Sequence, residues 1–174
     1  YNMVINGAMT VWQRGESFTS MGGFYADRWS TATNTNDTNV VTKYDIPSAG
    51  ETGLPIGFTN AIKFAWTAGS TGTLNDFRTR IEDPKRFMGQ TVTLSYYTRA
   101  SVACTINNRR LIFTNVTNPP TYTPLPALSV TTTWQRVVHT LTFGSSANAV
   151  FSSTSFLDLV LSNPINTTTD VYIT

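Results

Sequence analysis

Residues able to do acid–base or nucleophilic chemistry are scarce in this 174-residue chain. Its one histidine, His139, could serve as a base near neutral pH, but no nucleophilic Ser or Cys motif accompanies it. Glycoside hydrolysis needs two facing carboxyl groups, and the chain has only 10 Asp and Glu, several of them in turns. We therefore interpret His139 as a half-buried strand residue and predict no catalytic residues and no enzyme activity.

Metal and cofactor chemistry is equally poorly represented. Cys104 is the single cysteine, so the chain cannot form an internal disulfide or a cysteine-based zinc site. The sequence contains no glycine-rich phosphate loop and no histidine-based metal spacing. We expect Cys104 to be a small, buried strand residue, and the sequence predicts no bound metal and no cofactor.

Aromatic side chains are the best candidates for binding. Sugars lay their C–H faces on aromatic rings, while their hydroxyls hydrogen-bond to Arg, Asp, Asn and Gln. Tyr97 is out of phase with the apolar row of its strand, and Tyr122 lies in the proline-rich segment 118–126. Trp66 lies at a predicted strand end, although its phase favours the core. These three are the candidate ligand-binding residues; the alternative is that each is an ordinary exposed or core aromatic.

The opening of the chain concentrates aromatic and charged side chains in an otherwise charge-poor sequence. Its conspicuous residues are Trp12, Gln13, Arg14, Asp27, Arg28 and Trp29. We interpret them as a structural motif in which a partly buried, hydrogen-bonded charge cluster pins the segment onto the core, with both tryptophans as core residues. The alternative is that some of these groups face a glycan.

Strands must position these side chains, because helical periodicity is missing from almost the whole sequence. Short alternating or β-branched runs are separated by turn residues such as Gly, Pro, Asn and Ser. The pattern predicts strands at 29–33, 40–44, 61–66, 75–82, 91–99, 103–113, 135–143, 156–161 and 170–173. So many short strands predict an all-β fold, a two-sheet antiparallel β-sandwich, since one sheet cannot bury its apolar side alone.

Alternation within these strands predicts which side chains are buried. The expected core rows are Ile62, Phe64 and Trp66 opposite Lys63; Val92, Leu94 and Tyr96 opposite Tyr97; Val137, His139, Leu141 and Phe143 opposite Val138; and Leu157, Leu159 and Leu161 opposite Asp158 and Val160. Residues 83–88 are expected to form one helical turn, with Asp83 as its N-cap and Pro84 at the first helical position. No linker or repeat interrupts the pattern, so residues 1–174 are expected to form a single module.

The charge balance excludes two classes of partner. Charged residues make up 13% of the chain, against about 25% in typical soluble domains, and the formal net charge is +2. This charge is too small to direct the protein to nucleic acid or to an anionic membrane. No apolar run is long enough for membrane insertion or a signal peptide.

The order of several short motifs carries a family resemblance. The motifs are Asn-Gly with Trp-Gln-Arg-Gly within 6–15, Asp-Arg-Trp at 27–29, Arg-Ile-Glu at 80–82, Phe-Met-Gly-Gln-Thr-Val-Thr-Leu-Ser-Tyr-Tyr at 87–97, Thr-Thr-Trp-Gln-Arg-Val-Val at 132–138 and Asp-Val-Tyr-Ile-Thr at 170–174. In this order they resemble a module of bacteriophage virion proteins, mostly tail fibres and other host-facing appendages. The same layout is similar to carbohydrate-binding jelly-roll modules.

The resemblance implies a jelly roll located in the virion and assembled in the cytoplasm of the bacterial host. It implies a host surface polysaccharide and other virion proteins as partners. It also implies a homotrimer or another multi-copy assembly, because linking weak glycan sites raises their effective affinity. Similar proteins usually continue past the last strand, so a final strand or tail is expected beyond residue 174.

Two functions of different kinds follow from the resemblance. The leading hypothesis is a non-catalytic phage virion appendage module, a tail fibre or similar, that binds host surface glycans. The alternative is a purely structural virion protein, such as a head fibre, a capsid decoration protein or a baseplate component. A third and more distant hypothesis is a carbohydrate-binding module attached to an enzyme.

Overall fold

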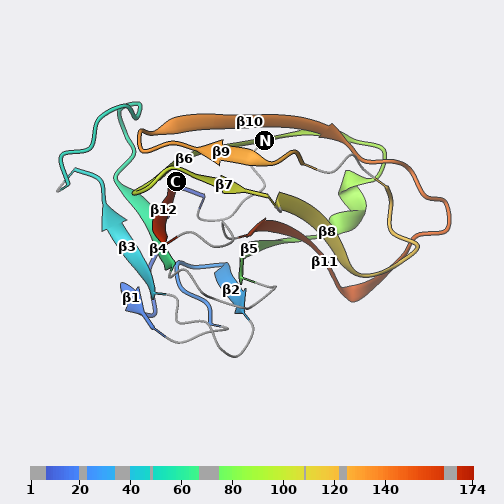
Figure 1. Cartoon of the computed structure of the whole chain (residues 1–174). Helices are drawn as coiled ribbons and strands as arrows, with labels where there is room; N and C mark the ends of the chain where they lie inside the picture. The colour runs from blue at the N-terminus through green and yellow to red at the C-terminus, as the bar shows by residue number, and fades with distance from the viewer. Residues whose placement is uncertain are drawn as a thin grey trace.

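The computed structural model describes residues 7–19, 23–33, 40–47, 49–66, 75–107, 109–121, 125–162 and 168–174. Their strands pair antiparallel and form two main sheets and a separate two-stranded ribbon (Figure 1). This arrangement confirms the predicted all-β fold of two antiparallel sheets. No helix among the described residues is long and apolar enough to cross a bilayer.

The larger sheet has six strands in the order β1-β3-β4-β12-β6-β10. In that order their bounds are Ser17–Phe18, Val40–Asp45, Asn60–Trp66, Thr169–Ile173, Thr91–Ala100 and Gln135–Thr142. Strand β12 comes last in the sequence but lies inside the sheet, where Val171 pairs with Phe64 of β4 and with Ala100 of β6. The chain therefore crosses between sheets before it completes this one.

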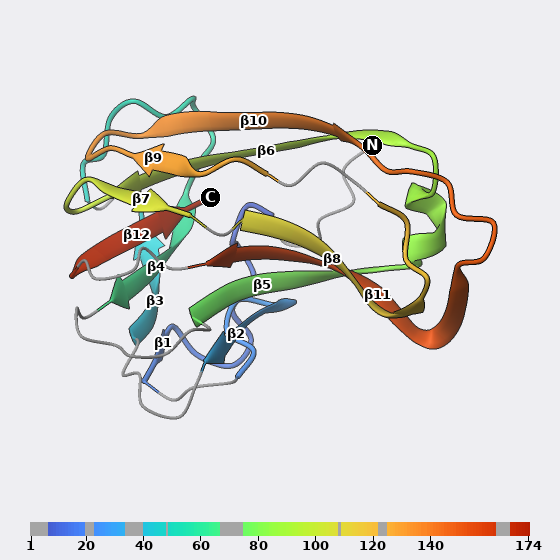
Figure 2. The same cartoon turned by 45° about the vertical axis from the view of Figure 1, so that its right-hand side comes forward.

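The smaller sheet has four strands in the order β2-β5-β11-β8, seen together in the lower half of Figure 2. In that order their bounds are Trp29–Thr33, Asn75–Glu82, Val150–Ser162 and Arg109–Thr117. Strands β7 (Cys104–Ile106) and β9 (Leu128–Val130) form the ribbon. Because β11 pairs with β5 on one side and β8 on the other, its outward side chains lie between those of two neighbouring strands.

Aromatic and branched side chains from both sheets fill the space between them. The rings of Phe64 (β4) and Phe77 (β5) lie 4.1 Å apart between centroids, and Trp29 (β2) stacks on Phe77 at 4.5 Å. The leucine row of β11 at 157, 159 and 161 is also buried, as predicted. Burial of one such side chain contributes about 1.5–3 kcal/mol, so these rows hold the two sheets together.

Two of the predicted core rows differ in detail. Asp158 and Val160, expected on the exposed side of β11, are buried as well. In β6 the expected core residues Leu94 and Tyr96 are only half-buried. The outward side chains of a central strand are covered by long side chains on its neighbours, and alternation along one strand cannot reveal that cover.

Most predicted strands agree with the structure to within one residue at each end, but one prediction is wrong. The single strand expected at 103–113 is two strands in different sheets, because β7 ends at Ile106 and β8 begins at Arg109. Asn107, which directly follows β7, is of a residue type that favours a change of direction. The pattern also misses the six residues at the start of β11, together with β1 and β9, which are too short for alternation to be visible.

The predicted helical turn is a 3₁₀ turn at Pro84–Phe87, with Pro84 at its start as expected. Asp83 occupies the N-cap position, as predicted, but its side chain does not cap the turn. Asp83 has a left-handed backbone, with φ 54° and ψ 61°, and makes no capping hydrogen bond through its side chain. Its Oδ2 instead accepts a hydrogen bond from Nε of Arg86 at 3.2 Å.

Candidate functional site

The segment 49–59 packs over one end of the outer side of the six-stranded sheet, and we name this covered end the closed face after the cluster Tyr44, Glu51, Arg99, Trp134 and Tyr172. Toward the other end, the outer side chains of β6 and β10, such as Thr93 and Thr140, are exposed. Glu51 accepts hydrogen bonds from the guanidinium of Arg99, from the hydroxyl of Tyr44 at 2.5 Å and from Nε1 of Trp134 at 3.1 Å. The guanidinium carbon of Arg99 lies 4.0 Å from the centroid of the Tyr172 ring. One carboxylate and one guanidinium are thus paired among aromatic side chains.

This cluster is largely removed from solvent. The side chains of Arg99 and Glu51 are 14% and 16% exposed. Burial raises the pKa of the Tyr44 hydroxyl, and its hydrogen bond to Glu51 acts in the same direction. Apolar side chains of the covering segment, Leu54 and Phe58, pack into the same cluster. The cluster therefore presents few open polar groups to a ligand.

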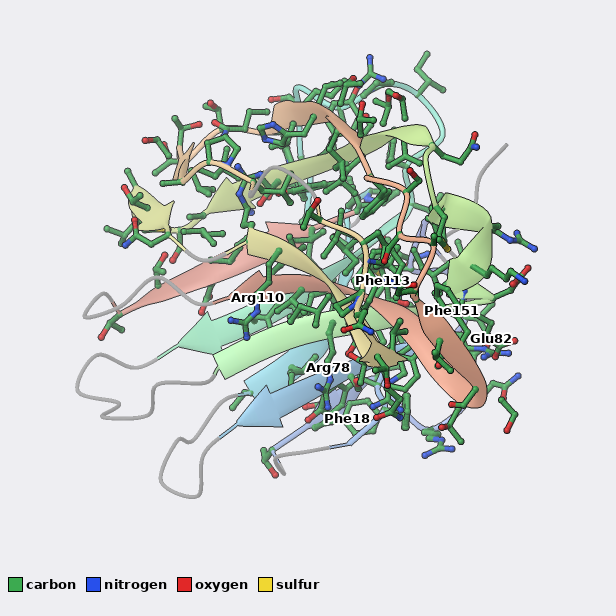
Figure 3. All side chains as sticks on the ribbon, turned by 90° about the vertical axis from the view of Figure 1, so that its right-hand side faces the viewer. Phe18, Arg78, Glu82, Arg110, Phe113 and Phe151 are labelled. Atoms are coloured by element: carbon green, nitrogen blue, oxygen red, sulfur yellow. The ribbon has the colours of Figure 1, made fainter. Side chains whose placement is uncertain are left out.

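The outer side of the four-stranded sheet carries a different set of side chains, which we name the arginine face. It consists of Arg78 and Arg80 of β5, Phe156 and Asp158 of β11, and Arg110 of β8. Figure 3 shows Arg78 and Arg110 on their two strands. Among the side chains that the structure describes, three basic groups and one acid therefore share this part of the sheet surface.

The strand register places these residues in neighbouring rows. Arg78, Val160 and Arg110 lie opposite one another across the sheet, and Arg80 lies opposite Asp158 in the next row. Neighbouring strands are about 4.8 Å apart, and residues that share a side repeat about every 6.6 Å along a strand. The carboxylate of Asp158 is therefore within reach of long basic side chains from both flanking strands.

Asp158 is buried, with a side chain that is 4% exposed. Its Oδ1 lies 3.5 Å from Nε of Arg80, its Oδ2 lies 4.0 Å from Nη1 of Arg78, and Thr114 donates a hydrogen bond to Oδ2 at 3.2 Å. Burial raises the pKa of Asp158, although both arginines and Thr114 act in the opposite direction. Its partners thus only partly offset the loss of solvent around this charge.

The arginines of this face retain hydrogen-bonding capacity. The side chains of Arg78 and Arg80 are 29% and 40% exposed, whereas their Nε atoms are buried and have no hydrogen-bond partner among the described residues. The guanidinium carbon of Arg80 lies 4.1 Å from the ring centroid of Phe156. At the edge of the face, Arg28 pairs with Glu82 at 2.5 Å, and both side chains are well exposed. Since each guanidinium has five N–H donors, the face can form further charge-assisted hydrogen bonds.

The remaining groups with chemical potential lie elsewhere. His139 is half-buried in β10, as predicted; burial and the nearby Arg109 lower its pKa. Cys104 is half-buried rather than buried, and burial raises the pKa of its thiol. Among the described residues, no three His, Cys, Asp or Glu side chains are grouped so as to hold a metal ion.

The three aromatic residues predicted to bind a ligand are not part of the arginine face as the structure describes it. Tyr97 lies on the closed face, half-buried, with its ring edge-on to Phe58 at 5.1 Å. Trp66 ends β4 opposite Thr169, and its side chain lies outside the described residues, as does all of Tyr122. Their role in binding stays a prediction.

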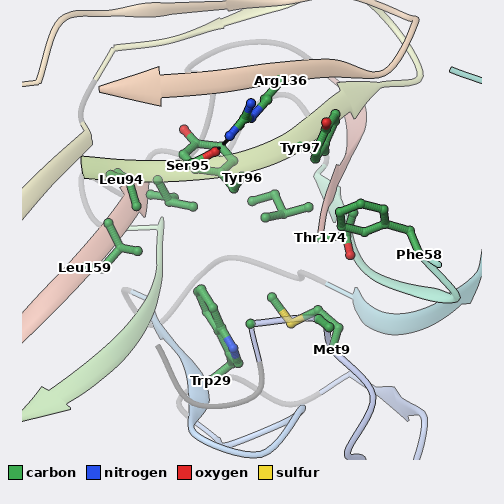
Figure 4. A pocket seen from close by; sticks show the side chains of 14 residues that line it. Met9, Trp29, Phe58, Leu94, Ser95, Tyr96, Tyr97, Arg136, Leu159 and Thr174 are labelled. Carbon is green, nitrogen blue, oxygen red and sulfur yellow. Dashed lines mark hydrogen bonds between the residues drawn. The ribbon is translucent and has the colours of Figure 1, made fainter. Parts of the chain in front are cut away.

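Tyr97 also borders a cavity of about 410 Å³. Figure 4 shows Met9 and Trp29 on one side of this space and Leu94 and Tyr96 on the other. Met9 and Trp29 belong to the core, and Leu94 and Tyr96 pack against it. We therefore regard the cavity as a gap in sandwich packing near the start of the described chain, and as a weaker candidate than the arginine face.

The opening motif is divided between the core and the surface. Trp29 is buried, and the half-buried Trp12 donates from Nε1 to the carbonyl of Met9 at 2.6 Å. Asp27 is half-buried, but Arg14 and Arg28 are exposed, so the expected partial burial is not seen for the two arginines. Gln13, Arg14, Asp27 and Arg28 instead line a shallow hollow of about 210 Å³ with Phe24 and Tyr25.

Sequence reasoning missed the arginine face, although one signal was present. Within the predicted strand 75–82, Arg78, Arg80 and Glu82 occupy every second position, which places all three on one side. Asp158 alternates with Leu157 and Leu159, so the sequence places it on the side of its strand opposite the leucines. Alternation cannot show that these two strands are neighbours.

Comparison with known proteins bears on the fold. No family model and no curated protein sequence matches the chain. Among solved structures, the family 11 carbohydrate-binding module of the cellulosomal cellulase Lic26A-Cel5E of Clostridium thermocellum is 10% identical, with a TM-score of 0.51, covering 90% of this chain and 90% of its own. The chain shares the β-sandwich fold of that module.

Two other solved structures cover the chain at lower TM-scores. A CBM4 structure is 18% identical and covers 97% of this chain and 94% of its own, with a TM-score of 0.49. The N-terminal cellulose-binding domain of β-1,4-glucanase C from Cellulomonas fimi is also 18% identical. It covers 91% of this chain and 90% of its own, with a TM-score of 0.46.

Proposed function

We propose that this chain is a non-catalytic module of a phage virion appendage, a tail fibre or similar, that binds a host surface polysaccharide through its arginine face. The virion context is supported by the order of sequence motifs, and glycan binding is supported by the fold shared with a family 11 carbohydrate-binding module. The observation that carries the proposal is the contrast between the covered Arg99–Glu51 pair on one outer face and the partly exposed guanidiniums of Arg78 and Arg80 on the other.

The chemistry of the arginine face suits a sugar chain. Sugar hydroxyls both donate and accept hydrogen bonds, so a binding surface needs groups of both kinds. Arg78 and Arg80 supply donors, while Glu82 supplies an exposed acceptor. Several copies of the module on one particle would raise the effective affinity by about 10²–10⁴.

The test is a glycan array of bacterial surface polysaccharides, followed by titration calorimetry on the best ligand with the full chain. We expect Arg78→Gln to weaken binding about tenfold or more, since a hydrogen bond to a charged group contributes about 1.5–3 kcal/mol. Arg86→Gln is the control, because Arg86 is also a partly exposed arginine beside one acid but lies on the 3₁₀ turn. Equal affinities of the two variants would place the site elsewhere.

A purely structural role in the virion is the second candidate. It is favoured by the hollow of the opening motif, where Phe24 is 42% exposed beside Arg14, and by the nearby Val11, which is 40% exposed. Exposed apolar side chains next to charged groups suit a protein contact. A map of the intact virion with the arginine face buried against another subunit would favour this role over glycan binding.

A further inference from the structure

Strand β6 has partners on both sides over only part of its length. It pairs with β10 over 91–98, but with β12 only over 98–100. Beyond that ladder, the N–H of Tyr97 donates to the carbonyl of Thr174 at 2.9 Å, and the N–H of Thr174 donates to the carbonyl of Tyr97 at 3.1 Å. Among the described residues, no strand pairs with 91–96 on the β12 side, and we name this stretch the free edge.

The backbone of the free edge is in phase with a further strand. Backbone groups of alternate residues in a strand point to the same side. Since Tyr97 bonds toward the β12 side, Ser95 and Thr93 direct their N–H and C=O groups to that side as well. Neither residue has a backbone hydrogen bond there among the described residues. A row of unpaired N–H and C=O groups is a template for pairing with another chain.

The cavity of about 410 Å³ lies beside the free edge and reaches both sides of the sheet. Leu94 and Tyr96, which line it from the inner side, are half-buried and pack against the core. Ser95 and Arg136, which line it from the outer side, are exposed (Figure 4). An engineered apolar cavity of about 150 Å³ binds benzene. The larger space beside the free edge therefore has room for a larger apolar side chain.

The walls of the cavity are held in place by contacts outside it. On one side, Trp29 stacks on Phe77 with ring centroids 4.5 Å apart. On the other side, the hydroxyl of Tyr96 accepts a hydrogen bond from the buried guanidinium of Arg109 at 3.1 Å. Protein interiors contain few voids of this size, and an unfilled apolar void lowers stability. A group that fills this preformed space therefore stabilises the sandwich.

We infer that the free edge binds an extended segment of another polypeptide, which joins the six-stranded sheet and points large apolar side chains into the cavity. In strand addition, backbone hydrogen bonds give affinity and pockets for alternate side chains give specificity. A small apolar molecule would fill the cavity but leave Ser95 and Thr93 unpaired. Phe58 of the segment 49–59 also borders the cavity, which leaves room for one extended segment but not for the edge of another folded sheet. The inference does not rest on the proposed function, because the arginine face belongs to the other sheet.

The experiment measures binding of labelled heptapeptides to the full chain by fluorescence anisotropy. One peptide alternates Thr and Leu, a second has Asn in place of Leu, and a third is the first peptide with every backbone nitrogen methylated. We expect the first peptide to bind about tenfold or more tightly than the other two, since the second lacks apolar side chains and the third lacks N–H donors.

Three variants tie the result to the free edge. Ser95→Pro removes the N–H that points away from β10, so it leaves the β10 ladder intact and weakens binding of the alternating peptide about tenfold or more. Ser95→Ala keeps this N–H and is the matched control, with binding unchanged. Leu94→Trp occupies part of the cavity and weakens the same binding, and it decides the test if Ser95→Pro does not fold.

Each contrary outcome is specific. Lack of binding by the alternating peptide overturns the inference, since the free edge is then closed or paired by this chain itself. Equal binding of the methylated peptide, or binding that neither Ser95→Pro nor Leu94→Trp weakens, overturns strand pairing at β6. A dimer of the full chain that Ser95→Pro dissociates assigns the edge to a second copy and overturns the partner strand. None of these results affects glycan binding, which Arg78→Gln tests on the other sheet.

Discussion

The two outer faces of the sandwich use the same kinds of side chain to different effect. On the closed face, Glu51 is matched to Arg99 and covered by its own segment of chain. On the arginine face, Asp158 lies among basic side chains that exceed it in charge. The comparison teaches that an ion pair under a covering segment stabilises a surface, whereas partly exposed basic side chains around one acid leave a surface able to contact a ligand.

The largest expected effect is on the closed face. Glu51→Ala leaves the guanidinium of Arg99, the hydroxyl of Tyr44 and the indole of Trp134 without their shared acceptor. We expect the free energy of unfolding to fall by about 3–5 kcal/mol, the usual cost of removing one partner from a buried pair. Urea denaturation followed by tryptophan fluorescence measures this loss.

The matched control is Glu82→Ala, because Glu82 also pairs with one arginine but both partners are exposed. We expect a loss within about 1 kcal/mol there. Similar losses in the two variants would show that the covering segment does not protect the Glu51 cluster, and the contrast between the faces would fail.

A matched pair of arginine substitutions sharpens the comparison. Arg99→Gln should lower the free energy of unfolding by about 2–3 kcal/mol, because it removes a charged hydrogen-bond donor from a buried acid. Arg78→Gln should cost less than about 1 kcal/mol, because Arg78 lies 4.0 Å from its acid and is partly solvated. Thermal and urea unfolding of both variants test this; equal losses would make the arginine face structural.

Asp158→Asn tests the acid at the centre of the arginine face. Because the pKa of Asp158 is raised from 3.8, the folded protein holds this proton more tightly than the unfolded chain. Ionisation therefore costs stability as the pH rises above 3.8, and we expect the variant to gain up to about 1 kcal/mol at pH 7. At pH values below 3.8 the gain should vanish; a less stable variant at pH 7 would contradict this account.

The smallest expected effect on the free energy of unfolding is that of His139, which is half-buried in β10. Because burial and Arg109 lower the pKa of His139 from 6.5, the unfolded chain binds this proton first as the pH falls. Stability should therefore decrease below pH 6.5 and level off below the folded-state pKa. In urea titrations at pH 7.5 and 5.5, His139→Gln should lose less stability than the parent chain, and an equal loss would exclude His139 as the cause.

The strands were predictable because their signal is local. At Trp29–Thr33 and Asn75–Glu82 the predicted and observed bounds coincide, since β-branched or alternating residues end at turn-forming ones. The prediction failed at 103–113, where the chain changes sheets. It also failed for β1, since the two residues Ser17 and Phe18 form a strand only by pairing with Thr42 and Val41.

The candidate site was predictable only in part. Alternation places Arg78, Arg80 and Glu82 on one side of a strand. The predicted binding residue was instead Tyr97, an aromatic residue on the side of its strand opposite the apolar row. The structure places Tyr97 beside Phe58 on the closed face. Phase tells which side of a strand a residue occupies, but not whether another segment covers that side.

The sequence alone determined that this chain forms strands, because the alternation of side chains along a strand involves only neighbouring residues. It also determined that two sheets must stack, because one sheet cannot bury its apolar side alone. Only the tertiary structure decided which surface stays open. Glu51 meets Arg99 and Trp134 across 48 and 83 residues of chain. Arg78 and Arg110 stand in one row of the sheet only because β11 lies between their strands. Such contacts depend on strand order and register, which no local pattern contains.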